Sequence, residues 1–206
     1  MHGLYGILPS ISDTEMLLDK AEAALRGGVR MVQFRNKKDG YKRALKQAKA
    51  LRTLTQKYQA MLIINDSLSM MEDCGADGVH VGRDDVADLL AMRERLGAER
   101  VLGVTCRADA AFARLALQQG ADYVSFGAVF ASTSKPEVPV LGLPRLLKCR
   151  QMFPDAKLCA IGGITEDNIA AVRHSGVDMA AVISGLFDAP DVQLQAEKLS
   201  ALWGQV

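Results

Sequence analysis

The sequence predicts an α/β fold, a single (β/α)8 TIM barrel that occupies residues 1–206 as one domain. Short apolar runs typical of buried strands alternate with amphipathic helical patterns along the whole chain, and eight such runs are present. This alternation produces parallel strands joined by helical crossovers. The length of 206 residues suits one such barrel, and no linker or low-complexity stretch interrupts it.

The expected strands are short apolar runs bounded by glycine or polar residues. They are Leu4–Leu8, Met31–Arg35, Met61–Asn65, Gly78–Val81, Val101–Val104, Tyr123–Phe126, Leu158–Ile161 and Ala180–Ser184. The expected helices have apolar residues at a 3.6-residue period. They include Thr14–Arg26, Gly40–Lys57, Asp85–Leu96, Ala108–Gln118, Leu143–Met152 and Pro190–Trp203.

Eight strands favour a closed barrel over an open doubly wound sheet, which usually has fewer strands and a glycine-rich first turn. No G-x-G-x-x-G segment follows the first expected strand. A G-[AV]-D pattern recurs at Gly75–Asp77, Gly120–Asp122 and Gly176–Asp178, where a helix ends at glycine and the next strand begins. We interpret it as one helix-to-strand junction used three times.

Composition narrows the class of function. The net charge of +1 argues against a nucleic-acid-binding protein, which needs an excess of positive charge to neutralise phosphates. No apolar run reaches the ~18 residues of a membrane helix, and the N-terminal segment lacks the pattern of a signal peptide. We therefore expect no membrane association and a cytoplasmic location. The cysteines lack C-x-x-C pairing and are expected to be reduced thiols: Cys74, Cys106, Cys149 and Cys159.

The second expected strand carries a charge where a barrel strand should be apolar. Its period of two directs Val32 and Phe34 toward the helices and Gln33 and Arg35 toward the barrel interior. A buried charge needs a partner. A substrate phosphate, shared with Lys37 just beyond the strand, is one such partner, and a salt bridge to a neighbouring strand is the alternative.

Two carboxylates follow the third and fourth expected strands. Asp66 comes directly after Asn65, and Asp85 follows the strand that contains His80. Because active sites of such barrels lie at the carboxyl ends of the strands, the pair could hold Mg²⁺, which takes one or two protein carboxylates. Each could equally cap the helix that follows it. We expect His80 to be a hydrogen-bonded structural residue rather than a base.

Three further strand ends suit phosphate groups. The segment Ser132-Thr133-Ser134-Lys135 offers three hydroxyls and an ammonium group, although an ordinary surface turn has the same composition. The last two strands end in Gly162-Gly163 and in Ser184-Gly185, and barrels of this type commonly bind phosphate on backbone N–H groups there.

Taken in order, these segments resemble the motif series of the thiamine-phosphate synthase family. The segments are VQFRNK, INDS, GADGVHVGRDD, LGVT, ADYVSFGAVFASTSKP, AIGGIT and VISG. The resemblance extends from about Leu4 to Leu186, and it rests on the order and spacing of the motifs rather than on any one of them.

The resemblance implies a role for each matching residue. The pyrimidine diphosphate site would be formed by Gln33, Arg35, Lys37, Asn65, Thr105 and Lys135, of which Arg35, Lys37 and Lys135 would be catalytic. The thiazole phosphate site would be formed by Ser132, Thr133, Ser134, Gly163, Ile183 and Ser184. Asp66 and Asp85 would bind Mg²⁺. The implied partners are small phosphorylated substrates, with no nucleic acid or membrane, and a homodimer is the expected form of any self-association.

The family joins a pyrimidine methyl diphosphate to a thiazole ethyl phosphate and releases pyrophosphate. The implied mechanism is dissociative: the diphosphate leaves first, the pyrimidine amino group stabilises the resulting cation, and the thiazole nitrogen captures it. Charge stabilisation and proximity would account for catalysis, with no protein nucleophile.

Several positions depart from the family pattern. Ser132 and Ser134 stand where threonines are usual, Arg83 replaces a glutamine, and Arg107 replaces a histidine. Two other functions are alternatives. One is a thiazole tautomerase, although that family relies on a histidine where this chain has Arg107 and tends to lack the paired acids. The other is a non-catalytic barrel that binds a thiamine precursor, which would explain Ser132 and Ser134 but not the retained Asp66 and Asp85.

Overall fold

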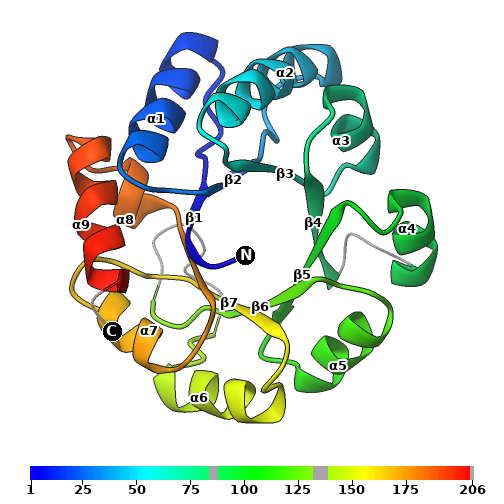
Figure 1. Ribbon diagram of the computed structural model, residues 1–206, viewed down its shortest axis with the longest axis vertical. Coiled ribbons are helices and arrows are strands. Elements are labelled where there is room, and N and C mark those ends of the chain that lie inside the picture. Colours follow the sequence, from blue (N-terminus) through cyan, green and yellow to red (C-terminus); the bar gives the residue numbers. More distant parts are fainter. Residues whose placement is uncertain (84–87, 132–138, 205–206) are drawn as a thin grey trace.

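The computed structural model describes residues 1–83, 88–131 and 139–204, and its strands form a closed parallel barrel in the order β1-β2-β3-β4-β5-β6-β7-β8. Figure 1 shows the ring of helices around this barrel. The strands are β1 Gly3–Ile7, β2 Met31–Phe34, β3 Met61–Asn65, β4 Gly78–Gly82, β5 Val101–Arg107, β6 Tyr123–Gly127, β7 Lys157–Ile161 and β8 Met179–Val182. The predicted fold class is confirmed.

The helices follow the strands in regular alternation. They are α1 Thr14–Arg26, α2 Tyr41–Lys57, α3 Leu68–Cys74, α4 Leu89–Leu96, α5 Ala110–Gln118, α6 Leu143–Met152, α7 Ile169–His174, α8 Ser184–Phe187 and α9 Val192–Gly204. No helix in the described ranges is both long and apolar enough to cross a bilayer.

Several predicted boundaries differ from the structure, among them the end of the fifth strand, which extends to Arg107 rather than Val104, and for two others the local reason is clear. The helix expected from Asp85 begins at Leu89, because the side chain of Asp88 caps it by accepting a hydrogen bond from the backbone of Ala91 at 3.0 Å. The eighth strand ends at Val182 rather than at Ser184, since Ser184 is already the first residue of α8.

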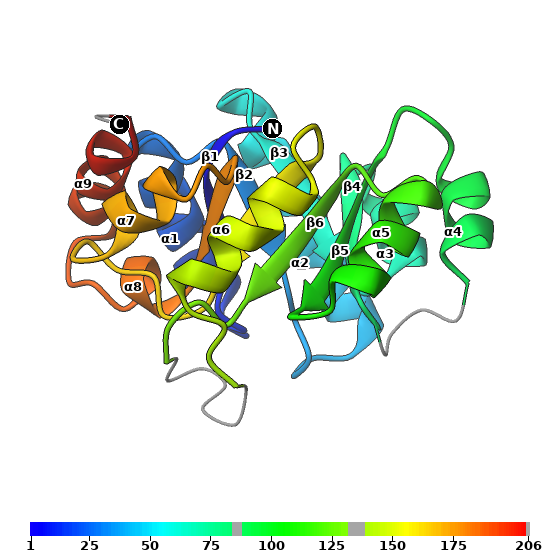
Figure 2. The ribbon, with the colours of Figure 1, turned by 90° about the horizontal axis from the view of Figure 1, so that it is seen from below.

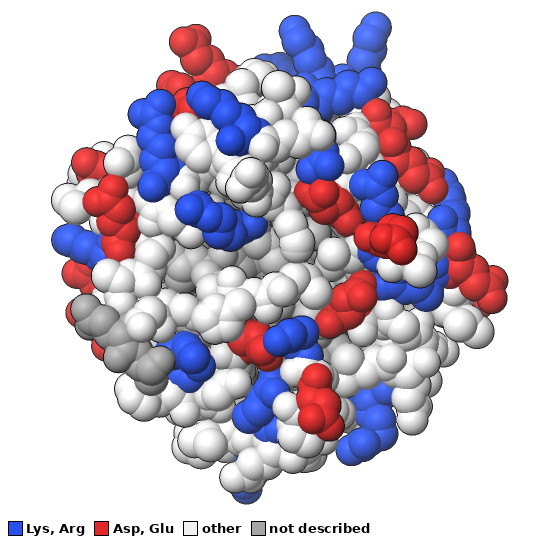
Figure 3. Space-filling model, in the orientation of Figure 1, with Lys and Arg blue, Asp and Glu red and all other residues white. Residues whose placement is uncertain are grey.

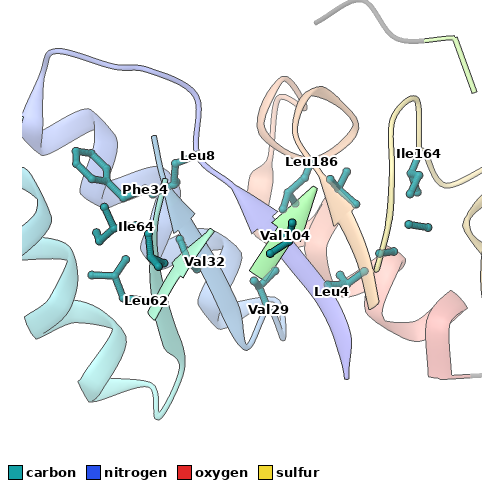
Figure 4. Close-up of a cluster of buried hydrophobic side chains, with 14 of the residues drawn as sticks. Leu4, Leu8, Val29, Val32, Phe34, Leu62, Ile64, Val104, Ile164 and Leu186 are labelled. Atoms are coloured by element: carbon teal, nitrogen blue, oxygen red, sulfur yellow. The ribbon is translucent and has the colours of Figure 1, made fainter. Parts of the chain in front are cut away.

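The core has two layers, as the alternation along β2 predicts. Val32 and Phe34 pair in register with Leu62 and Ile64 of β3 and pack in the outer layer, between the strands and the helices. Figure 4 shows these side chains together. Gln33 points the other way, into the barrel, and is buried. The polar side chain of β2 therefore lies in the interior of the barrel.

The three G-[AV]-D junctions are built alike, as predicted. At the last of them, Gly176 takes a left-handed φ of 83° and the Asp178 carboxylate pairs with Arg150 at 2.9 Å. The same carboxylate accepts a hydrogen bond from the backbone of Leu158, the second residue of β7, at 3.0 Å. Asp77 and Asp122 repeat this arrangement with Arg52 and Arg93.

The two ends of the barrel have different surroundings. Figure 2 shows β5 and β6 running toward the lower side of that view, away from the N-terminus. Figure 3 shows the end at which the strands begin, where acidic and basic side chains are interspersed around an uncharged hollow. The junctions stabilise that end, and the carboxyl ends of the strands lie at the other.

Candidate active site

A cavity of about 340 Å³ lies at the carboxyl ends of the strands. The residues that line it come from all eight strands and from the segments that follow β2, β6, β7 and β8. It includes seven of the residues named from the sequence: Gln33, Arg35, Asn65, Thr105, Gly163, Ile183 and Ser184. Residues from distant parts of the sequence therefore meet in one cavity.

Arg35 is half-buried at the end of β2 and lines the cavity. Its backbone carbonyl accepts a hydrogen bond from the hydroxyl of Ser10 at 2.9 Å, which fixes the backbone there. Its guanidinium group has no ion-pair partner within the described ranges, so the alternative of a salt bridge to a neighbouring strand is not found there. The charge is left facing the cavity, where an anionic ligand could pair with it.

Lys37, Asn65 and Asp66 form a cluster next to the cavity. The Lys37 ammonium lies 3.3 Å from Oδ2 of Asp66, and the Asn65 amide donates to the same oxygen at 2.5 Å. Asp66 has a positive φ of 60°, unusual for a residue with a side chain. Ser67, not Asp66, caps α3 by accepting from the backbone of Met70, so the capping interpretation of Asp66 is wrong.

The Asp66 carboxylate fits the ligand chemistry of Mg²⁺. Its second oxygen, Oδ1, has no hydrogen-bond partner among the residues that the structure describes. Mg²⁺ needs few protein ligands because water and phosphate oxygens complete its octahedron. No group of three or more potential metal ligands occurs in the described residues, and Asp85 lies outside them.

His80 lies buried between two hydroxyl groups. Its Nδ1 is 2.8 Å from the hydroxyl of Tyr123 and its Nε2 is 2.7 Å from that of Thr105. Burial lowers the pKa of His80 from 6.5 to about 4, so the ring is neutral at pH 7. The expected structural role of His80 agrees with these contacts.

Tyr123 and Tyr5 were not predicted to belong to the site. Their hydroxyls lie 3.0 Å apart in the barrel interior, and Gln33 donates to Tyr5 at 2.6 Å. Burial raises the pKa of both phenols, so they stay protonated. The sequence did offer an indication: β1 and β6 each carry a tyrosine at an inward position, where the hydroxyl requires a hydrogen-bond partner.

The glycines after β7 allow the backbone to approach its neighbours closely. Gly163 has a φ of 63°, and a Cβ there would lie 2.3 Å from the carbonyl oxygen of Ala131. The loop after β7 thus packs against the last described residue before the hydroxyl-rich segment. The segment's predicted site residues lie outside the described residues: Ser132, Thr133, Ser134 and Lys135.

Comparison with known proteins decides the family. The family model described as thiamine monophosphate synthase matches residues 4–186. The chain belongs to the thiamine monophosphate synthase family. The thiamine-phosphate synthase of Thioalkalivibrio sulfidiphilus is 42% identical over 98% of this chain and 96% of its own. That of Bordetella bronchiseptica is 43% identical, with coverages of 97% and 94%.

A solved structure leads to the same family. The thiamine phosphate pyrophosphorylase of Pyrococcus furiosus superposes with a TM-score of 0.88 at 30% identity, over 98% of this chain and 96% of its own. The family resemblance predicted from the motif series is therefore confirmed.

The two arginines that depart from the expected motif pattern lie in different surroundings in this member of the thiamine monophosphate synthase family. Arg107 lines the cavity with a positive φ of 53°, beside a register shift between β5 and β6 that starts at Thr105. Arg83 lies over the ring of Phe112 at 5.0 Å and pairs with Asp109. Arg107 is thus a cationic residue of the cavity lining, and the site prediction did not include it.

Proposed function

We propose that this chain is a Mg²⁺-dependent thiamine-phosphate synthase, an alkyl transferase. It would join 4-amino-2-methyl-5-(diphosphooxymethyl)pyrimidine to a thiazole ethyl phosphate, giving thiamine phosphate and pyrophosphate. Family membership supports the reaction. The observation that carries the proposal is the cavity at the carboxyl ends of the strands, lined by the Arg35 guanidinium and beside the Lys37–Asp66 pair.

The diphosphate half of the first substrate is assigned to the cationic side of the cavity. Arg35 is a planar donor that can bind two phosphate oxygens at once, and Lys37 is exposed and can turn toward the same group. Lys135 is proposed as the third cation. Gln33, Asn65 and Thr105 offer an amide, an amide and a hydroxyl for the pyrimidine ring.

Asp66 and Asp85 are proposed to hold the metal ion. Mg²⁺ would supply neutralisation of the charge that gathers on the diphosphate as it leaves. The contact with Lys37 keeps the Asp66 carboxylate close to the cationic residues, so ion, ammonium and guanidinium would act on one leaving group.

The thiazole phosphate is assigned to the part of the cavity formed by the segments after β7 and β8. Gly163, Ile183 and Ser184 line it, and their backbone N–H groups are the proposed phosphate donors. Ser132, Thr133 and Ser134 are proposed to complete this site with their hydroxyls. Binding of one anionic group in each of these two parts of the cavity would hold the reacting carbon and nitrogen close together.

The dissociative mechanism places few chemical demands on the protein. Arg35 and Lys37 stabilise the departing diphosphate, the cavity orients the two rings, and its apolar wall near Ile7 and Ile161 limits access of water to the cation. His80 is neutral and held by two hydroxyls, so no base is required from it.

The assay combines purified protein with the two phosphorylated precursors, with and without Mg²⁺. We expect thiamine phosphate and pyrophosphate in equal amounts, only when Mg²⁺ is present. A tautomerase would convert the thiazole alone, and a binding protein would retain both precursors unchanged. Either of these results would reject the synthase.

A further inference from the structure

A chain of hydrogen bonds crosses the interior of the barrel beneath the cavity. Gln33 donates to Tyr5 at 2.6 Å, and the Tyr5 and Tyr123 hydroxyls are 3.0 Å apart. The Tyr123 hydroxyl is 2.8 Å from Nδ1 of His80, whose Nε2 is 2.7 Å from the Thr105 hydroxyl. These contacts join five strands and connect Gln33 with Thr105, both of which line the cavity. Thr105 also accepts a hydrogen bond from Ser125 at 3.3 Å.

The two tyrosines cannot themselves contact a ligand. Tyr5 and Tyr123 are 1% and 0% exposed and neither lines the cavity. Their rings pack among apolar residues such as Ile63 and Met179, where a phenylalanine would also fit. A buried hydroxyl lowers stability unless it is hydrogen-bonded, so their contribution beyond packing is the contacts of the chain.

The neighbouring strand makes room for this arrangement. A Cβ at Gly103 of β5 would lie 2.1 Å from the Tyr123 ring and 2.3 Å from its hydroxyl. The Tyr123 ring then stacks on His80 with their centroids 5.4 Å apart. Ring and hydroxyl of Tyr123 are therefore both confined to one position.

The chain restricts which atom Gln33 offers to the cavity. An amide has a donor end and an acceptor end, and its Nε2 is held by Tyr5. The carbonyl oxygen Oε1 has no partner among the described residues, so with Nε2 held at Tyr5 it is the acceptor that Gln33 presents to a ligand, beside the second N–H of Nε2. A carbonyl oxygen accepts hydrogen bonds from amino groups, and the pyrimidine carries one.

We propose that Tyr5, Tyr123 and His80 are positioning residues that fix the amide of Gln33 and the hydroxyl of Thr105, so that the cavity selects a pyrimidine bearing an amino group. This inference rests on the proposed function for the identity of the ligand. The amino group becomes a stronger donor as the ring takes up positive charge. A fixed acceptor then stabilises the transition state more than the bound substrate.

The test measures ligand preference by calorimetry. The probes are the monophosphate of the aminopyrimidine methanol and its analogue with hydrogen in place of the amino group. We expect the wild-type protein to prefer the amino compound by about tenfold, the order of one buried hydrogen bond. Tyr5→Phe and Tyr123→Phe should each reduce this preference to about twofold, because Gln33 can then turn.

Tyr58→Phe is the matched control. Tyr58 is also a hydrogen-bonded tyrosine, but its hydroxyl donates to Glu22 at 2.6 Å, between α1 and α2. This variant should keep the wild-type preference. A merely structural role of the interior tyrosines would lower the melting temperature and leave the preference unchanged, and that result would overturn the proposal.

A second measurement covers the case in which an interior variant fails to fold. Nitrogen-15 NMR of the wild-type protein should show His80 as one neutral tautomer from about pH 5.5 to about 8, since both ring nitrogens are paired. A mixture of tautomers would contradict the fixed chain. Neither measurement requires turnover. The protein could therefore lack synthase activity and still show the tyrosine-dependent preference, and that result would reject the proposed function but support the positioning role.

Discussion

At the scale of single residues, the charged side chains of the site lie at the cavity, and the polar side chains beneath it are neutral. Arg35 and the Lys37–Asp66 pair lie at the cavity and its edge, where solvent and phosphate can reach them. The polar groups deeper in the barrel, including His80, are neutral and hydrogen-bonded. A charged group at the bottom would need a partner that the apolar interior does not supply. The cationic side chains that would bind the negatively charged substrates therefore lie at the mouth of the barrel.

Asp66→Ala should abolish Mg²⁺-dependent release of pyrophosphate, because the variant loses a proposed metal ligand and the partner of Lys37. Turnover should fall by about 100-fold or more, the order found when one electrostatic contact to developing charge is removed. A coupled pyrophosphate assay across a Mg²⁺ titration measures this. Asp155→Ala, at an exposed position, is the control. Near-normal turnover of Asp66→Ala would overturn the metal assignment.

The neutral state of His80 predicts a pH dependence of stability. Its pKa is about 4 in the folded protein and near 6.5 in the unfolded chain, so the unfolded chain binds an extra proton between these values. The free energy of unfolding should therefore fall as pH decreases from about 6.5 to about 4, by up to about 1.4 kcal/mol per pH unit from this group. Urea denaturation of His80→Gln should show a flatter dependence. Exposed His174→Gln should match the wild type, and equal slopes for both variants would contradict the prediction.

At the scale of helices and strands, sequence patterns predicted the features that depend on which side chains are buried. The α1 bounds and the inward position of Gln33 followed from apolar periodicity. The short helix α8, with four residues, did not, because its ends are set by packing rather than by a repeating pattern. The Tyr5–Tyr123 contact joins strands that are far apart in the sequence, so no local pattern could have indicated it.

The junction at Asp178 should stabilise the barrel without affecting the cavity. Its carboxylate contacts Arg150 and Lys157, each at 2.9 Å, and the backbone of Leu158. Asp178→Asn should lower the free energy of unfolding by about 1–3 kcal/mol, since these donors lose a charged acceptor. Urea denaturation measures the loss, with Asp155→Asn as the control. At a temperature where the variant stays folded, kcat/KM should be unchanged, and a loss of activity there would contradict the separation of the two ends.

At the scale of the whole molecule, barrel closure connects the site to global stability. Strand β1 pairs with both β2 and β8, so the sheet has no free edge and the ligand-binding residues belong to one continuous unit. Arg35 directly follows β2 and Ser184 begins the short helix after β8, so both are anchored next to strands of this sheet. A ligand that binds the native cavity should therefore stabilise the entire barrel.

Pyrophosphate with Mg²⁺ should accordingly raise the melting temperature. A ligand at 100 times its dissociation constant stabilises the native state by about 2.7 kcal/mol, which for a chain of this size is a rise of roughly 5–10 °C. Differential scanning calorimetry measures the shift. Arg35→Gln should lose most of it because the guanidinium is the proposed diphosphate contact, whereas Arg114→Gln, which removes an exposed arginine that stacks on Phe153, should keep it. An equal shift in both variants would place the pyrophosphate away from Arg35, and the assignment of that side of the cavity to the leaving group would then be wrong.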